Sequence, residues 1–233
     1  EEDLFHIGYL PEERGLYPKM KVGEQAIYLA RLKGLSKADA QQRVKEWFER
    51  LEITSWWDKR VEELSKGMQQ KVQFVTTVVH EPRLLIFDEP FSGFDPVNAE
   101  VLKREILALK AKGTTLMLST HNMQSVEELC DDITLINRAE VVLSGQTAEI
   151  RRAHGSHTAR VVYEGEISPT DLSRLNILEH EEREYSKILR VQLQPEEELR
   201  SIIAQLPSTI QLQSVELEYP SMHEIFLETV QAK

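Results

Sequence analysis

The stretch "LLIFDEPFSGFDP" (residues 84–96) decides the fold class. Four apolar residues end abruptly at Asp88, Glu89 and Pro90, and a further acid, Asp95, follows in a turn. A continuous apolar run is typical of a strand buried on both faces of a parallel sheet. Open α/β sheets bind ligands at the carboxyl ends of their strands, where these acids lie. Alone, the stretch fits either a magnesium and water site for nucleotide chemistry or a pair of capping acids.

The segments around this stretch alternate between strand and helix patterns. We expect strands at residues 6–11, 84–87 and 114–120, helices at 97–112 and 123–130, and a hairpin-like pair around 137–140. The alternation from 84 to 135 indicates a parallel sheet with helical crossovers. Residues 22–82 instead carry apolar residues at helical spacing, with Ser36 and Ser65 as expected N-caps, and predict an inserted helical region.

The composition shifts at residues 151–158, "RRAHGSHT", and a different pattern follows. We expect strands at 158–164, 177–182, 186–194 and 210–218, and helices at 169–175, 195–205 and 220–230. This βαββαβ order with a final helix is the plan of a small split-βαβ α/β sandwich. The sequence therefore predicts two domains, residues 1–152 and 155–233.

Bulk properties exclude several classes of protein. The 233 residues carry a net charge of −11, from 28 basic and 39 acidic side chains, which disfavours binding to nucleic acid or to a bare anionic membrane. No apolar run approaches the about 18 residues of a membrane span, and the acidic first residues do not resemble a signal peptide. The single cysteine, Cys130, cannot form an internal disulfide and is typical of a cytosolic protein.

Four short motifs occur in one order along the chain. They are "LSKGMQQ" (64–70), "LLIFDEP" (84–90), "SGFD" (92–95) and "STH" (119–121). Together they resemble the signature, Walker B, D-loop and switch motifs of the ATP-binding cassette (ABC) transporter ATPases, and the resemblance covers residues 6–148. The chain looks like the bacterial exporter type with a small C-terminal domain. The resemblance implies an α/β fold with an incomplete RecA-like P-loop core, an inserted helical subdomain at 22–82, and a ferredoxin-like α+β domain.

The resemblance gives each motif residue a role. It implies that Asp88 binds Mg²⁺, that Glu89 is the general base, and that His121 contacts the γ-phosphate. ATP held by a partner subunit would be contacted by Ser65, Lys66, Gly67 and Met68, and Asp95 would cross the dimer interface. Taken singly, these residues have simpler interpretations: a serine N-cap, an aspartate that opens a turn, and a solvated histidine at a helix start.

The chain departs from the family pattern at three positions. The signature has Lys66 where glycine is usual and Met68 where glutamine is usual, whereas Ser65 and Gly67 are intact. Lys66 either adds charge near a phosphate or points to solvent; we favour solvent. Glu12 stands where the glutamine of the glutamine loop is usual. Its carboxylate could still contact water or Mg²⁺, but it adds negative charge beside Asp88 and Glu89, which argues against a catalytic role. A role as a sensor that contacts the permease stays open.

The phosphate-binding motif GxxxxGK[ST] does not occur in these residues. In the family this loop precedes the glutamine loop, so we expect a truncated chain. Neither ATP nor Mg²⁺ is then expected to bind normally, and the chain alone is expected not to hydrolyse ATP. In the family a strand lies between those expected at 114–120 and near 132–136. We therefore expect a rearranged or disordered core, or association with another copy.

The first functional hypothesis is the ATPase subunit of a bacterial exporter, peripheral at the cytoplasmic face of the membrane. It would act as a homodimer or paired with another ABC subunit, on integral-membrane permease subunits and without nucleic acid. The loop 12–20 and the helical region would receive a permease helix, with Trp56 and Trp57 as candidate lining residues, although we favour core packing for at least one of them. The alternatives are a non-transport regulatory protein of the family, and a binding module in which the C-terminal domain is the functional part.

Overall fold

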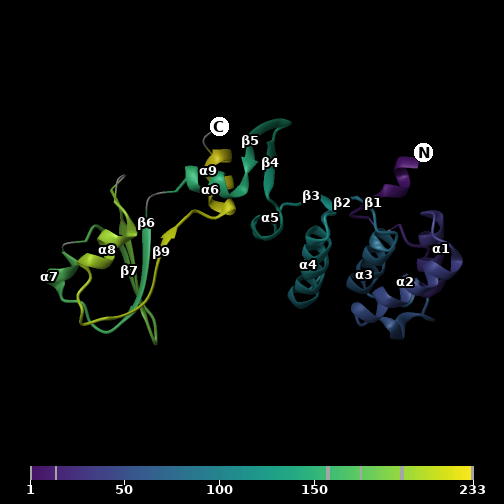
Figure 1. The fold of residues 1–233 in the computed structure, drawn as a ribbon, viewed down its shortest axis with the longest axis horizontal. Coiled ribbons are helices and arrows are strands. Elements are labelled where there is room, and N and C mark those ends of the chain that lie inside the picture. The colour runs from purple at the N-terminus through teal and green to yellow at the C-terminus, as the bar shows by residue number, and fades with distance from the viewer. Residues whose placement is uncertain (1, 14, 156–157, 174, 195–196, 232–233) are drawn as a thin grey trace. The chain divides into compact units, whose positions relative to one another are not determined.

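We analysed a computed structural model, which describes residues 2–13, 15–155, 158–173, 175–194 and 197–231 (Figure 1). The chain divides into two compact units, Glu1–Ser125 and Val126–Lys233. The domain boundary expected at residues 152–155 follows the composition shift and stays a prediction. Within the described ranges, no helix is long and apolar enough to cross a membrane.

The first unit contains a sheet of three parallel strands in the order β1-β2-β3. These are β1 (Ile7–Leu10), β2 (Leu84–Asp88) and β3 (Thr115–Ser119). Leu85 and Phe87 of β2 are buried at 0% and 1% exposure, which explains the continuous apolar pattern of this central strand. Helix α4 (Pro96–Ala111) connects β2 to β3 as the expected crossover. The predicted α/β core is confirmed.

The inserted region is helical, as its apolar spacing predicts. It contains α1 (Val22–Leu32), α2 (Lys37–Arg50) and α3 (Lys66–Val78), together with the short 3-10 helices η2 (Thr54–Trp56) and η3 (Val61–Glu63). The hydroxyls of Ser36 and Ser65 cap α2 and α3 as expected, accepting from Asp39 N at 3.2 Å and Met68 N at 3.3 Å. The 3-10 helix η1 (Glu2–His6) precedes β1 and was not predicted.

A chain of aromatic rings joins the helical region to the sheet. The ring of Phe74 on α3 lies 5.8 Å from that of Trp47 on α2 and 6.0 Å from that of Phe87 on β2. Trp57 packs edge-to-face on Phe48 at 5.4 Å, in line with the core packing expected for at least one of the two tryptophans. The rings pack α2 and α3 against β2, the strand that ends at Asp88 and is followed by Glu89.

Strand β3 is an edge strand within the described part of the first unit, since it pairs only with β2. Its outward residue Met117 is 64% exposed, although the sequence "TTLMLST" reads as a buried strand. In the second unit, β4 (Asp132–Asn137) pairs only with β5 (Glu140–Gln146) among the described residues. Among the described residues each of these two apolar strands has one strand neighbour. The expected rearranged or disordered core, or association with another copy, stays a prediction.

The second unit begins within α5 (Met123–Leu129) and continues into the β4–β5 hairpin. The hairpin turns at Arg138 and Ala139, whose φ angles of 49° and 64° are both left-handed, as in a type I′ turn. Helix α6 (Thr147–Ala153) follows and was not predicted. Its sequence is mostly polar, and Thr147 and Ile150 are its buried residues, so no helical period was visible.

The C-terminal sheet is antiparallel in the order β7-β8-β6-β9. Its strands are β6 (Thr158–Glu164), β7 (Ile177–Glu182), β8 (Lys187–Gln192) and β9 (Gln211–Glu218). Helix α7 (Pro169–Leu172) joins β6 to β7, and α8 (Leu199–Gln205) joins β8 to β9. The order is that of a ferredoxin-like split-βαβ domain, as predicted.

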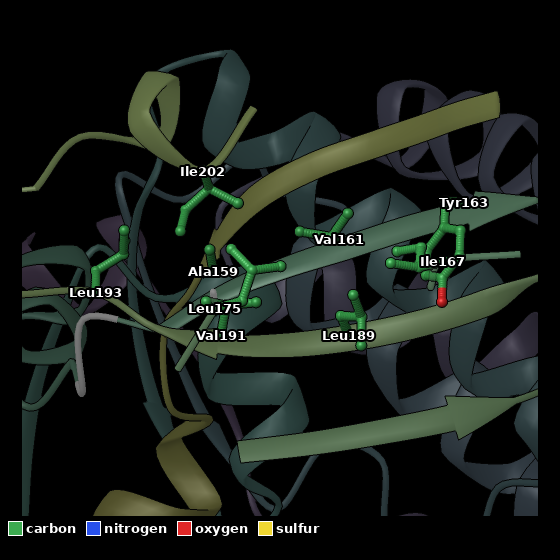
Figure 2. Packing of buried hydrophobic residues seen from close by; sticks show 9 residues of the cluster. All are labelled: Ala159, Val161, Tyr163, Ile167, Leu175, Leu189, Val191, Leu193 and Ile202. Carbon is green, nitrogen blue, oxygen red and sulfur yellow. The ribbon is translucent and has the colours of Figure 1, made fainter. Parts of the chain in front are cut away.

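One face of this sheet forms the core of the C-terminal domain (Figure 2). Buried residues of β6 and β8 contribute alternate positions, and Ile202 contributes from α8; the cluster contains Ala159, Val161, Tyr163, Ile167, Leu175, Leu189, Val191, Leu193 and Ile202. Helix α7 ends three residues earlier than expected. Helix α8 begins four residues later, and the expected residues 195 and 196 lie outside the described residues.

The last helix, α9 (Met222–Gln231), is fastened to α5 and α6 by side chains. The Glu127 carboxylate accepts the backbone N–H of Met222 at 2.6 Å and pairs with Arg151 at 3.4 Å. Arg151 Nε also donates to the carbonyl of Pro220 at 2.9 Å. An acid at the start of a helix satisfies N–H groups that have no partner within the helix.

Candidate functional site

The carboxyl ends of β1, β2 and β3 form one edge of the parallel sheet. The register pairs Leu10 with Phe87, Phe87 with Leu118, and Asp88 with Ser119. Parallel strands end at the same side of a sheet, so the residues that follow these pairs converge. This geometry brings the "DEP" and "STH" motifs together, 31 or more positions apart in the sequence.

Glu89 is held at this edge by an unusual backbone conformation. Its φ is 45°, a left-handed value that a residue with a side chain rarely adopts. Its N–H donates to the carbonyl of Ser119 at 3.0 Å, which continues the ladder between β2 and β3. Backbone outliers of this kind are frequent at functional sites. Here the conformation points the Glu89 carboxylate toward Thr120 and His121, which directly follow β3.

The carboxylate of Glu89 contacts His121 directly. Glu89 Oε1 accepts from the backbone N–H of His121 at 2.8 Å and lies 2.6 Å from its Nδ1. Because a carboxylate oxygen accepts, Nδ1 carries the proton in this contact. The side chain of Glu89 is 20% exposed and that of His121 is 88% exposed, so the imidazole faces solvent while the acid is sheltered.

Two hydroxyls complete this group, and our interpretation of the sequence gave neither of them a role. Ser119 Oγ donates to Asp88 Oδ1 at 2.5 Å, and Thr120 Oγ1 donates to Glu89 Oε2 at 3.2 Å. The signal was present in the sequence, because two hydroxyl residues follow an apolar strand whose neighbour ends in two acids. Only the parallel register between the strands shows which hydroxyl meets which acid.

The N-terminus of α3 lies beside the "SGFD" loop of the same chain. A Cβ placed on Gly67 would lie 3.5 Å from the Gly93 carbonyl and 3.7 Å from the Phe94 ring, both ordinary contact distances. Lys66 is exposed, in agreement with the solvent-facing interpretation, and Met68 is half-buried. The structure thus brings Ser65, Lys66, Gly67 and Met68 next to the loop that contains Asp95.

Two buried glutamines on α3 were also missed. Gln70 Nε2 donates to the Pro90 carbonyl at 3.4 Å, and Gln73 Nε2 donates to the Pro11 carbonyl at 3.2 Å. Pro90 directly follows the two acids, and Pro11 precedes Glu12. These amides link the signature helix to both loops; the detectable signal was polar residues on a helix face that is otherwise apolar.

Asp95 and Glu12 lie apart from the group around Glu89. Asp95 caps α4, accepting from Asn98 N at 3.0 Å and Asn98 Nδ2 at 2.5 Å, and this side-chain hydrogen bond holds the pKa of its carboxyl below the usual value. Capping of α4 corresponds to the simpler interpretation of Asp95, that of an aspartate that opens a turn. Glu12 is exposed in the loop after β1. The dimer role of Asp95 and the sensor role of Glu12 stay predictions.

A cavity of about 700 Å³ lies between β1, α1 and α3. It is mainly apolar, and its lining includes Tyr9, Leu16, Leu29, Leu32, Thr77 and His80. His80 is 8% exposed, and its Nε2 lies 3.3 Å from the Ile7 carbonyl. Burial lowers the pKa of His80 to about 4, and the nearby charges of Lys33 and His6 act in the same direction.

The free energy of unfolding should therefore depend on pH through His80. Between about pH 6.5 and pH 4 the unfolded chain binds a proton at this residue that the folded chain does not bind. Stability should fall as pH drops through this window, by at most about 3 kcal/mol. Urea unfolding at about pH 7 and pH 5 measures the loss, which His80→Gln should reduce and the exposed control His223→Gln should leave unchanged.

Sequence comparison identifies the family. Residues 3–92 match the profile described as ABC transporter, and residues 145–230 match that of the DrrA1-3-like ATP-binding protein C-terminal domain. An uncharacterized ABC transporter ATP-binding protein of Alkalihalophilus pseudofirmus is 46% identical over 224 residues, 96% of this chain and 83% of its own length. The chain belongs to the ABC transporter ATP-binding proteins.

Further similarities agree with this assignment. The ABC transporter ATP-binding protein YhaQ of Bacillus subtilis, also uncharacterized, is 44% identical over 97% of this chain and 75% of its own length. A solved structure of an ATP-binding subunit of an ABC transporter superposes with a TM-score of 0.58 at 33% identity. That superposition covers 64% of this chain and 62% of the solved chain. ABC ATP-binding subunits bind ATP with Mg²⁺, and they work with membrane permeases.

Proposed function

We propose that this chain is the ATP-hydrolysing subunit of a bacterial ABC exporter. The observation that carries the proposal is the contact between Glu89 and His121, with Asp88 one residue away at the carboxyl end of β2. A carboxylate beside an imidazole at a sheet edge provides a proton acceptor and a donor on one side of a bound phosphate. ATP supplies the phosphoryl group that such a site transfers to water.

The donor set fits magnesium nucleotide better than a resident metal ion. Among the described residues, no three His, Cys, Asp or Glu side chains gather closely enough to hold a metal by themselves. Mg²⁺ in nucleotide sites uses one or two carboxylates and completes its shell with phosphate oxygens and water. Asp88 would hold such an ion, with its Oδ1 oriented by Ser119.

The remaining motif residues would complete the site. Glu89 would accept a proton from water, and His121 would turn its exposed imidazole toward the phosphate. A helix start leaves N–H groups without partners in the helix, so Ser65 and Gly67 at the start of α3 would attract the phosphates of ATP held by a second subunit. Lys66 and Met68 would lie beside them, and Asp95 would face that subunit.

The cavity beside β1 supports a membrane partner. Its apolar lining comes from η1, β1, α1 and the loop after β1, and α3 adds polar side chains; α1, α3 and this loop belong to the region expected to receive a permease helix. We propose that an integral-membrane permease docks here, and that the chain works as a homodimer or paired ABC subunit at the cytoplasmic face of the membrane. Glu12, in the adjoining loop, would sense this contact.

The export direction and the C-terminal domain are supported by relatives. The linearmycin resistance ATP-binding protein LnrL of Bacillus subtilis is 26% identical over 95% of this chain and 73% of its own length. Its name describes linearmycin resistance, and we take this resistance as support for outward transport. We propose that residues 1–152 form the ATPase domain and 155–233 an accessory domain.

The 233-residue chain by itself should show no measurable ATP turnover. Its residues contain no GxxxxGK[ST] loop, so Asp88 and Glu89 would have no positioned phosphate. Phosphate release from the purified chain measures this directly. Turnover that disappears in Glu89→Gln would contradict the prediction, and stoichiometric co-purification with a membrane permease would support the transport function.

A further inference from the structure

Three consecutive residues of one strand end contact two consecutive acids of its neighbour. Ser119 donates to Asp88, Thr120 donates to Glu89, and His121 donates to Glu89 through its backbone and its ring. The proposed function assigns roles to His121 and, through Asp88, to Ser119, but none to Thr120. The hydrogen bond from the Thr120 hydroxyl to Glu89 therefore needs a role of its own.

The hydroxyl of Thr120 is oriented by its own neighbour. Asn122 N donates to Thr120 Oγ1 at 3.1 Å, so this oxygen already accepts a hydrogen bond while it donates to Glu89 Oε2 at 3.2 Å. Thr120 is half-buried, unlike the exposed ring of His121. It is therefore the more sheltered of the two side chains that contact Glu89.

Thr120 and His121 hold different oxygens of the carboxylate. Oε1 takes both bonds from His121, and Oε2 takes the bond from Thr120. A carboxylate held at one oxygen alone can still turn about its last side-chain torsion, whose energy profile is broad. A second bond, to the other oxygen, fixes the plane of the group and so the direction in which a lone pair points.

We propose that Thr120 is a positioning residue for the Glu89 carboxylate. This inference rests on the proposed function, because it assigns Thr120 to the base of that reaction. The Thr120 hydroxyl fixes the plane of the carboxylate, which in turn keeps Nδ1 of His121 as the protonated nitrogen. Ser119 acts separately, on Asp88.

Nuclear magnetic resonance of the 233-residue chain tests the contact without nucleotide. The ¹⁵N shifts of the His121 ring report which nitrogen carries the proton. Thr120→Val keeps the side-chain shape and removes the hydroxyl, so the Nδ1–H pattern should give way to the Nε2–H form common in water. Thr120→Ser should retain the wild-type pattern, and Ser119→Ala, the matched control, should also retain it.

A Thr120→Val chain that keeps the wild-type His121 pattern would overturn the proposal, as would a Thr120→Ser chain that loses it. The amide spectrum establishes that each variant is folded, and Thr120→Ala replaces Thr120→Val if the latter is not. No nucleotide is present, so this result is independent of whether the site hydrolyses ATP.

A kinetic measurement tests the consequence for the reaction. In a transporter whose ATPase subunit also includes a phosphate-binding loop, Thr120→Val should lower kcat about tenfold at unchanged KM, and Thr120→Ser should stay near wild type. An unchanged kcat in Thr120→Val would overturn the positioning role. If Glu89→Gln in the same complex leaves turnover intact, the proposed function fails instead, and the two failures are distinguishable.

Discussion

Replacing Glu89 with glutamine should lower ATP turnover by on the order of 10²–10⁴-fold in a transporter whose ATPase subunit also includes a phosphate-binding loop. Glutamine has the same shape but cannot accept a proton from water at this position. Its amide also replaces one carboxylate oxygen with a donor, so the contacts at 2.6 Å and 3.2 Å can both persist only if Thr120 accepts from the amide instead of donating. Phosphate release at saturating ATP measures the change.

Glu81 offers a matched control in the same unit. It also has a left-handed φ, 55°, and its carboxylate pairs with Arg43 at 2.8 Å on the surface. Glu81→Gln repeats the chemical change away from the sheet edge and should leave turnover close to wild type. If Glu89→Gln and Glu81→Gln lowered ATP turnover equally, Glu89 would not be the general base.

Replacing Phe87 with alanine should destabilise the first unit by about 3–5 kcal/mol. The side chain is 1% exposed on the central strand, and its ring packs 6.0 Å from that of Phe74. Removing the ring leaves a cavity between the sheet and α3, because the surrounding side chains are held by their own packing and do not move in to fill the space. Urea unfolding followed by circular dichroism gives the change in the free energy of unfolding.

Phe5 provides the comparison for this experiment. It precedes β1 and is 45% exposed, so Phe5→Ala removes the same atoms with much less loss of burial. We expect at most about 1 kcal/mol from that substitution. A small effect of Phe87→Ala would mean that the ring cluster joining α2, α3 and β2 does not support the fold.

Much of the architecture was predictable because local signals agreed with it. Serine caps mark the starts of α2 and α3, and apolar runs mark β2 and β3. The βαββαβ order alone gave the strand order of the C-terminal sheet, since that plan fixes which strands are neighbours. The candidate site residues were named from motifs, and the parallel register explains why Glu89 and His121 meet.

Other features depend on contacts that the sequence does not display. Helix α6 has few buried residues, and it forms where Arg151 reaches Glu127 and Pro220. The roles of Ser119 and Thr120 follow from the pairing of Asp88 with Ser119, which a single strand cannot reveal. Met117 belongs to an apolar run yet is largely exposed, because burial of a strand depends on both neighbours.

The fastening of α9 has a consequence for how the polypeptide matures on the ribosome. Met222, the partner of Glu127, lies 95 positions later in the sequence, and Pro220, the partner of Arg151, lies 69 positions later. Until residues 220–222 leave the exit tunnel, Glu127 and Arg151 lack these partners. Such long-range closure slows folding, so the second unit stays incomplete until these residues have been synthesised, and a nascent chain stalled before them would be a natural target for chaperones.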